Sequence, residues 1–107
     1  MLVFGKVIAS NIGDAPLEEI IARLSENESV FDLQMICAQG ATGAIAILSA
    51  AEAMKPFYAN IRIKVVGMAY GKAEAKRLLA DMLRAYIAQG QDVFSFKRHC
   101  LGLEERV

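Results

Sequence analysis

Apolar side chains recur along the chain with the spacing of strands and helices, so its elements can be predicted from the order of residues. Leu2–Ser10 is rich in β-branched residues and is predicted to be a strand. Asp14 follows a short turn and is expected to cap a helix. One apolar stripe at helical spacing supports that helix, formed by Leu17, Ile20, Ile21 and Leu24.

Two later segments alternate between apolar and polar residues, as strands with one buried face do. They are Val30–Cys37 and residues 60–69. One face is expected to carry Phe31, Leu33, Met35 and Cys37 in the first strand and Ile61, Ile63 and Val65 in the second, with Asp32, Gln34, Arg62 and Lys64 opposite.

The remaining segments predict two more helices and a last strand. Thr42–Phe57 is small and apolar and reads as a helix that Pro56 helps to end. Lys72–Gln89 has an apolar stripe and is followed by Gly90, which favours a helix end. Residues 92–100 are predicted to be a strand. The order β-α-β-α-β-α-β predicts one α/β domain over residues 1–107, with a mainly parallel sheet flanked by helices.

Self-association is expected because the chain of 107 residues is 55% apolar, more than one small core readily covers. The predicted helix over residues 42–57 is apolar around most of its surface and needs a neighbour. We therefore predict a homo-oligomer in which Ile45, Leu48, Ala51 and Met54 lie at the contact.

Charge and cysteine content narrow the possible partners. The net charge is zero, with a balance of −5 in residues 1–54 and +5 in residues 55–107, and the basic residues are spread out. We therefore expect no nucleic-acid partner, while a protein partner stays open. No stretch is long and apolar enough to span a membrane, and no signal peptide is evident. The two cysteines are too few for a disulfide framework, which favours the cytoplasm.

Two glycine-containing turns are the candidate ligand-binding positions, because each is expected to join a strand end to a helix start. Backbone N–H groups there favour an anion, although neither turn has the pattern of a phosphate loop. A tight structural turn is the alternative interpretation. The candidate residues are Gly40, Ala41, Thr42 and Gly43 in the first turn and Gly67, Met68 and Gly71 in the second.

Residues suited to catalysis are few. His99 is the one histidine of the chain and a weak candidate base, next to Cys100. Together with Cys37 these residues do not make a convincing metal-ligand set. No metal and no cofactor are therefore predicted, and a surface histidine beside a buried thiol is the simpler interpretation.

The order of elements over residues 2–102 resembles the proteolytic subunit of the Clp protease. The resemblance is carried by "LVFGKVIASNIGDAPLEEIIARLSENESVFDLQMICAQGATG", by "AEAMKPF" and by "IRIKVVGMA". It implies a crotonase-like core in which Gly40, Ala41 and Thr42 stand at the family's Gly-Gly-Ser turn. It also implies that Gly71 replaces the nucleophilic serine, so peptidase activity is not expected.

The sequence as a whole favours a binding or scaffold domain that self-associates. A regulatory STAS domain is one alternative, since it also places a glycine-containing turn before a helix. A small enzyme is another alternative, in which the two glycine turns form a crevice and His99 supplies the base.

Overall fold

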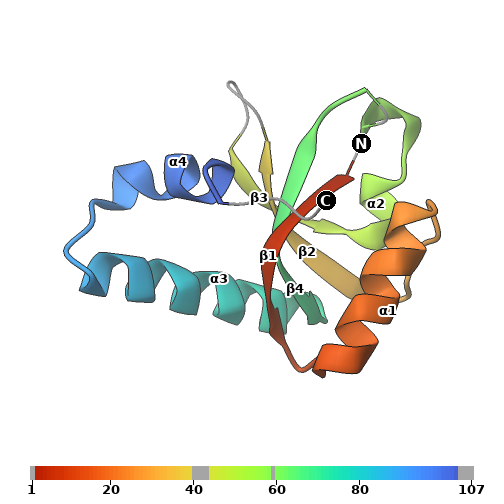
Figure 1. The fold of residues 1–107 in the computed structure, drawn as a ribbon, viewed down its shortest axis with the longest axis horizontal. Coiled ribbons are helices and arrows are strands. Elements are labelled where there is room, and N and C mark those ends of the chain that lie inside the picture. Colours follow the sequence, from red (N-terminus) through yellow and green to blue (C-terminus); the bar gives the residue numbers. More distant parts are fainter. Residues whose placement is uncertain (1, 40–43, 59, 104–107) are drawn as a thin grey trace.

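The computed structural model of the chain describes residues 2–39, 44–58 and 60–103. One sheet forms its centre, with helices on both faces (Figure 1). Its strands are β1 (Leu2–Ser10), β2 (Leu33–Gln39), β3 (Ile45–Ser49) and β4 (Ile63–Tyr70). The helices are α1 (Asp14–Ser25), α2 (Ala50–Ala53), α3 (Lys72–Ala88) and α4 (Phe96–Leu101), with 3-10 turns η1 (Pro56–Tyr58) and η2 (Val93–Ser95).

The sheet is mixed, so the prediction of a mainly parallel sheet was wrong. Its strand order is β1-β4-β2-β3. β1 and β4 run parallel, whereas β2 is antiparallel to both of its neighbours. The short segment between Gln39 and Ile45 allows β3 to return beside β2, and such a short connection can join only antiparallel strands.

One face of the sheet packs against α1 and α2. The predicted stripe of α1 is confirmed, because Leu17, Ile20, Ile21 and Leu24 are all buried. They meet side chains of β2 and β4, which include Leu33, Met35, Cys37, Ile63 and Val65. The helix begins at Asp14 with Gly13 at the N-cap, and no side chain caps it, so the predicted capping role of Asp14 was wrong.

The opposite face packs against α3 and α4 (Figure 1). The predicted stripe of α3 is also confirmed: Ala75, Leu78 and Tyr86 are buried, and Leu79 and Met82 are partly buried. This second layer changes the environment of Lys64. The alternation placed it on a polar face, yet its side chain is 1% exposed.

The segment predicted as one helix over Thr42–Phe57 contains a strand, a short helix and a 3-10 turn. In its described part, Ile45–Ser49 pairs with residues 34–38 of β2. The helix starts only at Ala50, where the Ser49 side chain accepts a hydrogen bond of 3.0 Å from the Glu52 N–H. Ser49 and Glu52 have the S-x-x-E spacing of a capping box, which is the sequence signal for this helix start.

The predicted strand over residues 92–100 is helical instead. The Asp92 side chain accepts a hydrogen bond of 2.9 Å from the Phe94 N–H and caps η2, and α4 follows directly. Phe96 and Cys100, four residues apart, form the buried side of α4. Apolar residues at that spacing share a helix face, so α4 can pack on the sheet without joining it.

Candidate ligand-binding cavity

The residues predicted as the second glycine turn do not form one turn: two lie inside a central strand, and one follows the end of that strand. Gly67 and Met68 lie within β4, and the Met68 side chain is fully buried. Gly71 lies at the start of α3 with φ of +85° and donates a backbone hydrogen bond of 2.9 Å to the Asp32 carbonyl. Gly67 is therefore a packing position, whereas Gly71 is a turn position that needs left-handed backbone.

The two predicted turns are not brought together into one crevice. Gly40, Ala41, Thr42 and Gly43 lie outside the described residues. The strand before them ends at Gln39, which pairs with Ile63 at the start of β4. Gly71 follows the other end of β4, where Tyr70 pairs with Leu33. Antiparallel pairing thus places the end of β2 and the end of β4 at opposite borders of the sheet.

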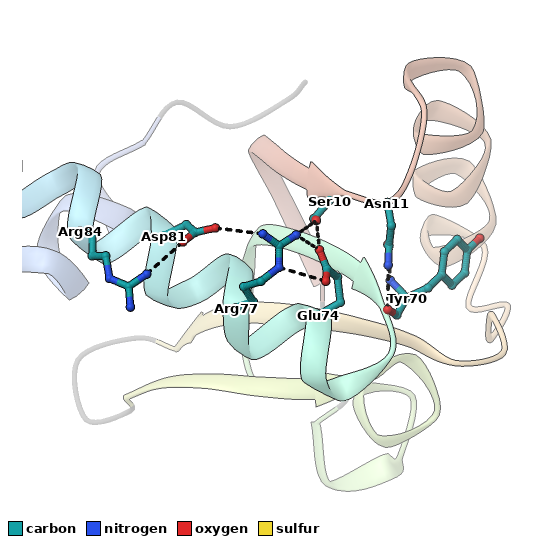
Figure 2. Close-up of polar contacts among 7 residues, drawn as sticks. All are labelled: Ser10, Asn11, Tyr70, Glu74, Arg77, Asp81 and Arg84. Atoms are coloured by element: carbon teal, nitrogen blue, oxygen red, sulfur yellow. Dashed lines mark hydrogen bonds and ion pairs between the residues drawn. The ribbon is translucent and has the colours of Figure 1, made fainter.

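A polar network lies where β1 and β4 end (Figure 2). The Ser10 hydroxyl donates to the Glu74 carboxylate, which also accepts hydrogen bonds from Arg77. The chain of contacts continues along α3, with Arg77 Nη1 at 3.5 Å from Asp81 Oδ2 and Arg84 Nη1 at 3.2 Å from Asp81 Oδ1. This network ties the first turns of α3 to the end of β1.

The network is better suited to structure than to catalysis. Hydrogen bonds from Arg77 and Ser10 lower the pKa of Glu74, because both stabilise its ionised form. A carboxylate with a lowered pKa is a poor base for activating the Ser10 hydroxyl. We therefore interpret these contacts as a link between strand and helix.

The Asn11 side chain pairs with the backbone of β4 at the same end of the sheet (Figure 2). Its amide nitrogen donates to the Tyr70 carbonyl at 3.0 Å, and the Tyr70 N–H donates to its amide oxygen at 2.8 Å. Asn11 has φ of 51°, which turns the backbone away while the side chain continues the pairing of β1 with β4. Asparagine suits this position because it tolerates left-handed backbone and supplies both a donor and an acceptor.

Two substitutions separate these contributions of Asn11. Asn11→Gly keeps the left-handed backbone accessible and removes both hydrogen bonds, and we expect a loss of about 1 kcal/mol in the free energy of unfolding. Asn11→Ala adds the cost of a positive φ, and we expect a loss of about 2 kcal/mol. Urea unfolding of both variants measures the difference. Equal free energies of unfolding for the two variants would contradict a cost of the positive φ at residue 11.

A hollow lies between β1, α3 and α4. This cavity has a volume of about 270 Å³. Most of its lining is apolar or aromatic, and no acidic side chain belongs to the described lining. The lining residues are Lys6, Ile8, Met82, Ala85, Tyr86, Gln89, Phe96, His99, Cys100 and Leu103.

A bulge in β1 determines which side chains reach the cavity. The register of β1 against β4 shifts between Phe4 and Ile8. Phe4, Val7 and Ala9 pack on the α1 side of the sheet, whereas Lys6 and Ile8 line the cavity on the other side. Strict alternation would put Lys6 on the same face as Phe4. Sequence reasoning missed Lys6 and Ile8, and Gly5 within the strand is the signal that could have indicated the bulge.

The wall of the cavity holds His99, which the sequence predicted on a strand and which instead lies in α4. Its ring packs against Tyr86 in a tilted arrangement, with the ring centroids 4.7 Å apart and the ring planes at 35°. The Tyr86 hydroxyl shares a hydrogen bond with Ser95, and Phe96 meets the Tyr86 ring edge-on. His99 has no carboxylate partner among the described residues, so the arrangement lacks the group that would orient a catalytic histidine.

The two cysteines are buried and reduced. Burial raises the pKa of the Cys37 thiol to about 12. Burial also raises the pKa of the Cys100 thiol to about 11, while the charge of Lys64 partly opposes that shift. Both are therefore neutral thiols near pH 7, and neither is an activated nucleophile. Within residues 2–39, 44–58 and 60–103, histidine, cysteine and carboxylate side chains form no group of three that could hold a metal ion.

The residues predicted at a subunit contact now occupy different elements. Ile45 and Leu48 lie on β3, Ala51 lies on α2 and Met54 follows it. The continuous helix that suggested the contact is therefore absent, although Ile45 and Leu48 stay only half-buried. Self-association itself stays a prediction.

Comparisons with models of known families, with curated proteins and with solved structures found no match to this chain. The resemblance to the Clp subunit stays a prediction. Its first motif ends in Gly40–Gly43, outside the described residues, and the segment after that motif begins with a strand. In the part of the chain that the structure describes, no helix is both long enough and apolar enough to cross a membrane.

Proposed function

We propose that this chain is a binding domain that holds a small apolar molecule with an anionic group in the cavity between β1, α3 and α4. The observation that carries the proposal is the composition of the lining: most of its side chains are apolar or aromatic, and Lys6 is the one lysine in it, with no arginine or carboxylate among the described lining residues. Small-molecule sites commonly combine an apolar wall with a few polar groups that orient the ligand.

The size of the cavity limits the ligand. A volume of about 270 Å³ is near the lower end of the range for small-molecule sites, about 300 to 1,000 Å³. One aromatic ring or a short aliphatic chain with a polar head is of suitable size. The exposed rim, which includes Ile8 at 47% exposure, leaves the head of such a ligand near solvent.

The charge of the lining favours an acid over a base. Lys6 is exposed and makes no hydrogen bond or ion pair with any described residue, which supports a role for its ammonium group in binding a ligand carboxylate. The His99 ring on α4 and the Gln89 amide at the end of α3 add hydrogen-bonding groups to the lining. A cationic ligand would meet Lys6 without a compensating carboxylate from the described lining.

Binding is favoured over the alternative of an enzyme. Catalysis by His99 would need a partner that orients the ring, and none is present among the described residues. The neutral thiol of Cys100 also lacks an activating base. A cytoplasmic location is part of the proposal, since a reducing compartment suits two buried free thiols.

Benzoate and benzamide provide a matched test, because they share a ring and differ in charge. We expect benzoate to shift the amide NMR signals of Lys6, Ile8 and His99, and benzamide to bind more weakly at the same place. Lys6→Met should weaken benzoate binding by about fivefold, since an exposed ion pair contributes up to about 1 kcal/mol. The same change should leave benzamide binding unaltered.

Two variants control this experiment. Lys76→Met removes an exposed α3 lysine that is not part of the lining, and it should leave both titrations unchanged. Ala85→Phe places a ring in the mouth of the cavity and should abolish both. If millimolar benzoate shifted no signal in this region, or bound equally well to Ala85→Phe, the proposed function would be wrong.

A further inference from the structure

The two edge strands of the sheet differ in how they are protected against pairing. β1 and β3 lie at opposite ends of the strand order (Figure 1). β1 has a bulge between Phe4 and Ile8 and an exposed lysine, Lys6, within it. Bulges and lysines are the devices that keep edge strands from pairing with other chains. The β1 edge is therefore protected by the features that also build the cavity.

β3 has none of these devices. Its residues, Ile45–Ser49, read IAILS and include no charged residue and no proline. Its register with β2 is unbroken from Ile45 to Ser49, so no bulge turns the edge away. All five residues are half-buried, and in the described chain β3 pairs with β2 alone. On one side of its backbone the outward N–H and C=O groups therefore pair with no other described strand.

We infer that β3 pairs antiparallel with β3 of a second copy of the chain around a two-fold axis. The strand is its own complement in that orientation. With Ile47 opposite Ile47 of the partner subunit, Ala46 faces Leu48 and Ile45 faces Ser49, so no charges oppose each other. The pairing joins two four-stranded sheets into one continuous sheet.

A second copy fits this edge better than an unrelated strand does. Both faces of β3 carry apolar side chains: Ile45 and Ile47 pack on the side of α3 and α4, and Leu48 packs on the side of α1 and α2. A two-fold axis brings each face against its own copy, so apolar side chains continue across the junction on both faces. The cavity lies beside β1 at the opposite border and stays open in this dimer.

The first test uses the unchanged protein. Light scattering is expected to show twice the chain mass of 11.6 kDa, falling toward the chain mass on dilution. Hydrogen exchange should then locate the contact. In a monomer alternate amides of β3 point away from β2 and exchange quickly, whereas in the dimer all five should be protected, with protection that is lost on dilution.

A matched pair of lysine variants provides the second test. Ala46→Lys adds to β3 the kind of charge that protects β1, and it is expected to yield the chain mass and fast exchange of alternate β3 amides. Ala22→Lys makes the same change on the exposed side of α1 and should stay dimeric. A monomer at millimolar concentration would overturn the inference. So would a dimer of the unchanged protein in which alternate β3 amides exchange quickly. The benzoate titration reports on the cavity beside β1, whereas the dimer experiments report on β3 at the other edge of the sheet. Either proposal can therefore fail without the other.

Discussion

Lys64→Met is expected to lower the free energy of unfolding by about 3 kcal/mol and to release α4 from the sheet. The Lys64 ammonium group donates to the Leu101 carbonyl at 3.1 Å and also to the Leu103 carbonyl. Leu101 is the last residue of α4 and Leu103 lies two residues beyond it, and carbonyls at a helix C-terminus need hydrogen-bond donors from outside the helix. Lys64 therefore holds the last helix to β4 through its backbone.

The magnitude follows from what the substitution leaves behind. Methionine keeps the apolar stem that fills the site, so the change mainly removes two hydrogen bonds from a charged donor. Each such bond contributes about 1.5 to 3 kcal/mol, and relief of the buried ammonium group offsets part of the loss. For a domain whose total stability is about 5 to 15 kcal/mol, this is a large fraction.

Urea unfolding and hydrogen exchange measure the two parts of this prediction. The amides of Phe96–Leu101 should exchange faster in Lys64→Met, and benzoate binding should weaken because α4 forms one wall of the cavity. Lys76→Met, which removes an exposed lysine from α3, is the control and should have the stability of the unchanged protein. Unaltered stability and exchange in Lys64→Met would contradict the anchoring role.

Gly67→Ala is expected to cost about 2 kcal/mol because the sheet interior has no room for a methyl group. A Cβ at position 67 would lie 2.9 Å from Cδ1 and 3.3 Å from Cβ of Ile36. The end of the Ile36 side chain could rotate, but its Cβ is attached to the backbone of β2. Ile36 is fully buried, so the strain must spread into the packing beneath α3.

A second substitution tests whether Ile36 is the cause. Ile36→Val removes Cδ1, the nearest atom, and alone should cost about 1 kcal/mol. The double variant should lose about 1 kcal/mol less stability than the sum of the losses in the two single variants, as expected for residues in contact. Gly102→Ala is the control, since its new Cβ would lie 3.4 Å from the Arg98 carbonyl oxygen, an ordinary contact distance. Strict additivity would assign the cost of Gly67→Ala to another neighbour.

Local pattern was sufficient for the elements whose side chains repeat over many residues. α1 and α3 each have a stripe several turns long, and the α1 stripe is buried while the α3 stripe is buried or partly buried. β1 was predicted with its observed bounds, Leu2–Ser10. In such segments propensity and periodicity agree, and packing has no reason to override them.

Prediction from the hydrophobic pattern failed for short segments that are compatible with either a helix or a strand. In these segments the neighbouring elements decide which of the two forms. Alternating alanine and isoleucine over residues 44–47 is compatible with a helix, but β2 offers a ladder of hydrogen bonds that makes Ile45–Ser49 a strand. The segment after Asp92 suits a strand equally well. It forms α4 because Phe96 and Cys100 fit the sheet face beside α3, and because Lys64 binds the end of the helix.

The sequence by itself determined the class of the protein, a chain with one α/β sheet, and the buried stripes of its two long helices. Only the tertiary structure decided the direction of β2, the burial of Lys64 and the cavity that contains Lys6 and His99. The physical reason is that each feature depends on contacts between residues far apart in the chain. The direction of β2 depends on its pairing with β3 and β4. A bulge in β1 decides which face of the sheet Lys6 occupies, and a second helical layer covers Lys64, which alternation alone marks as facing solvent.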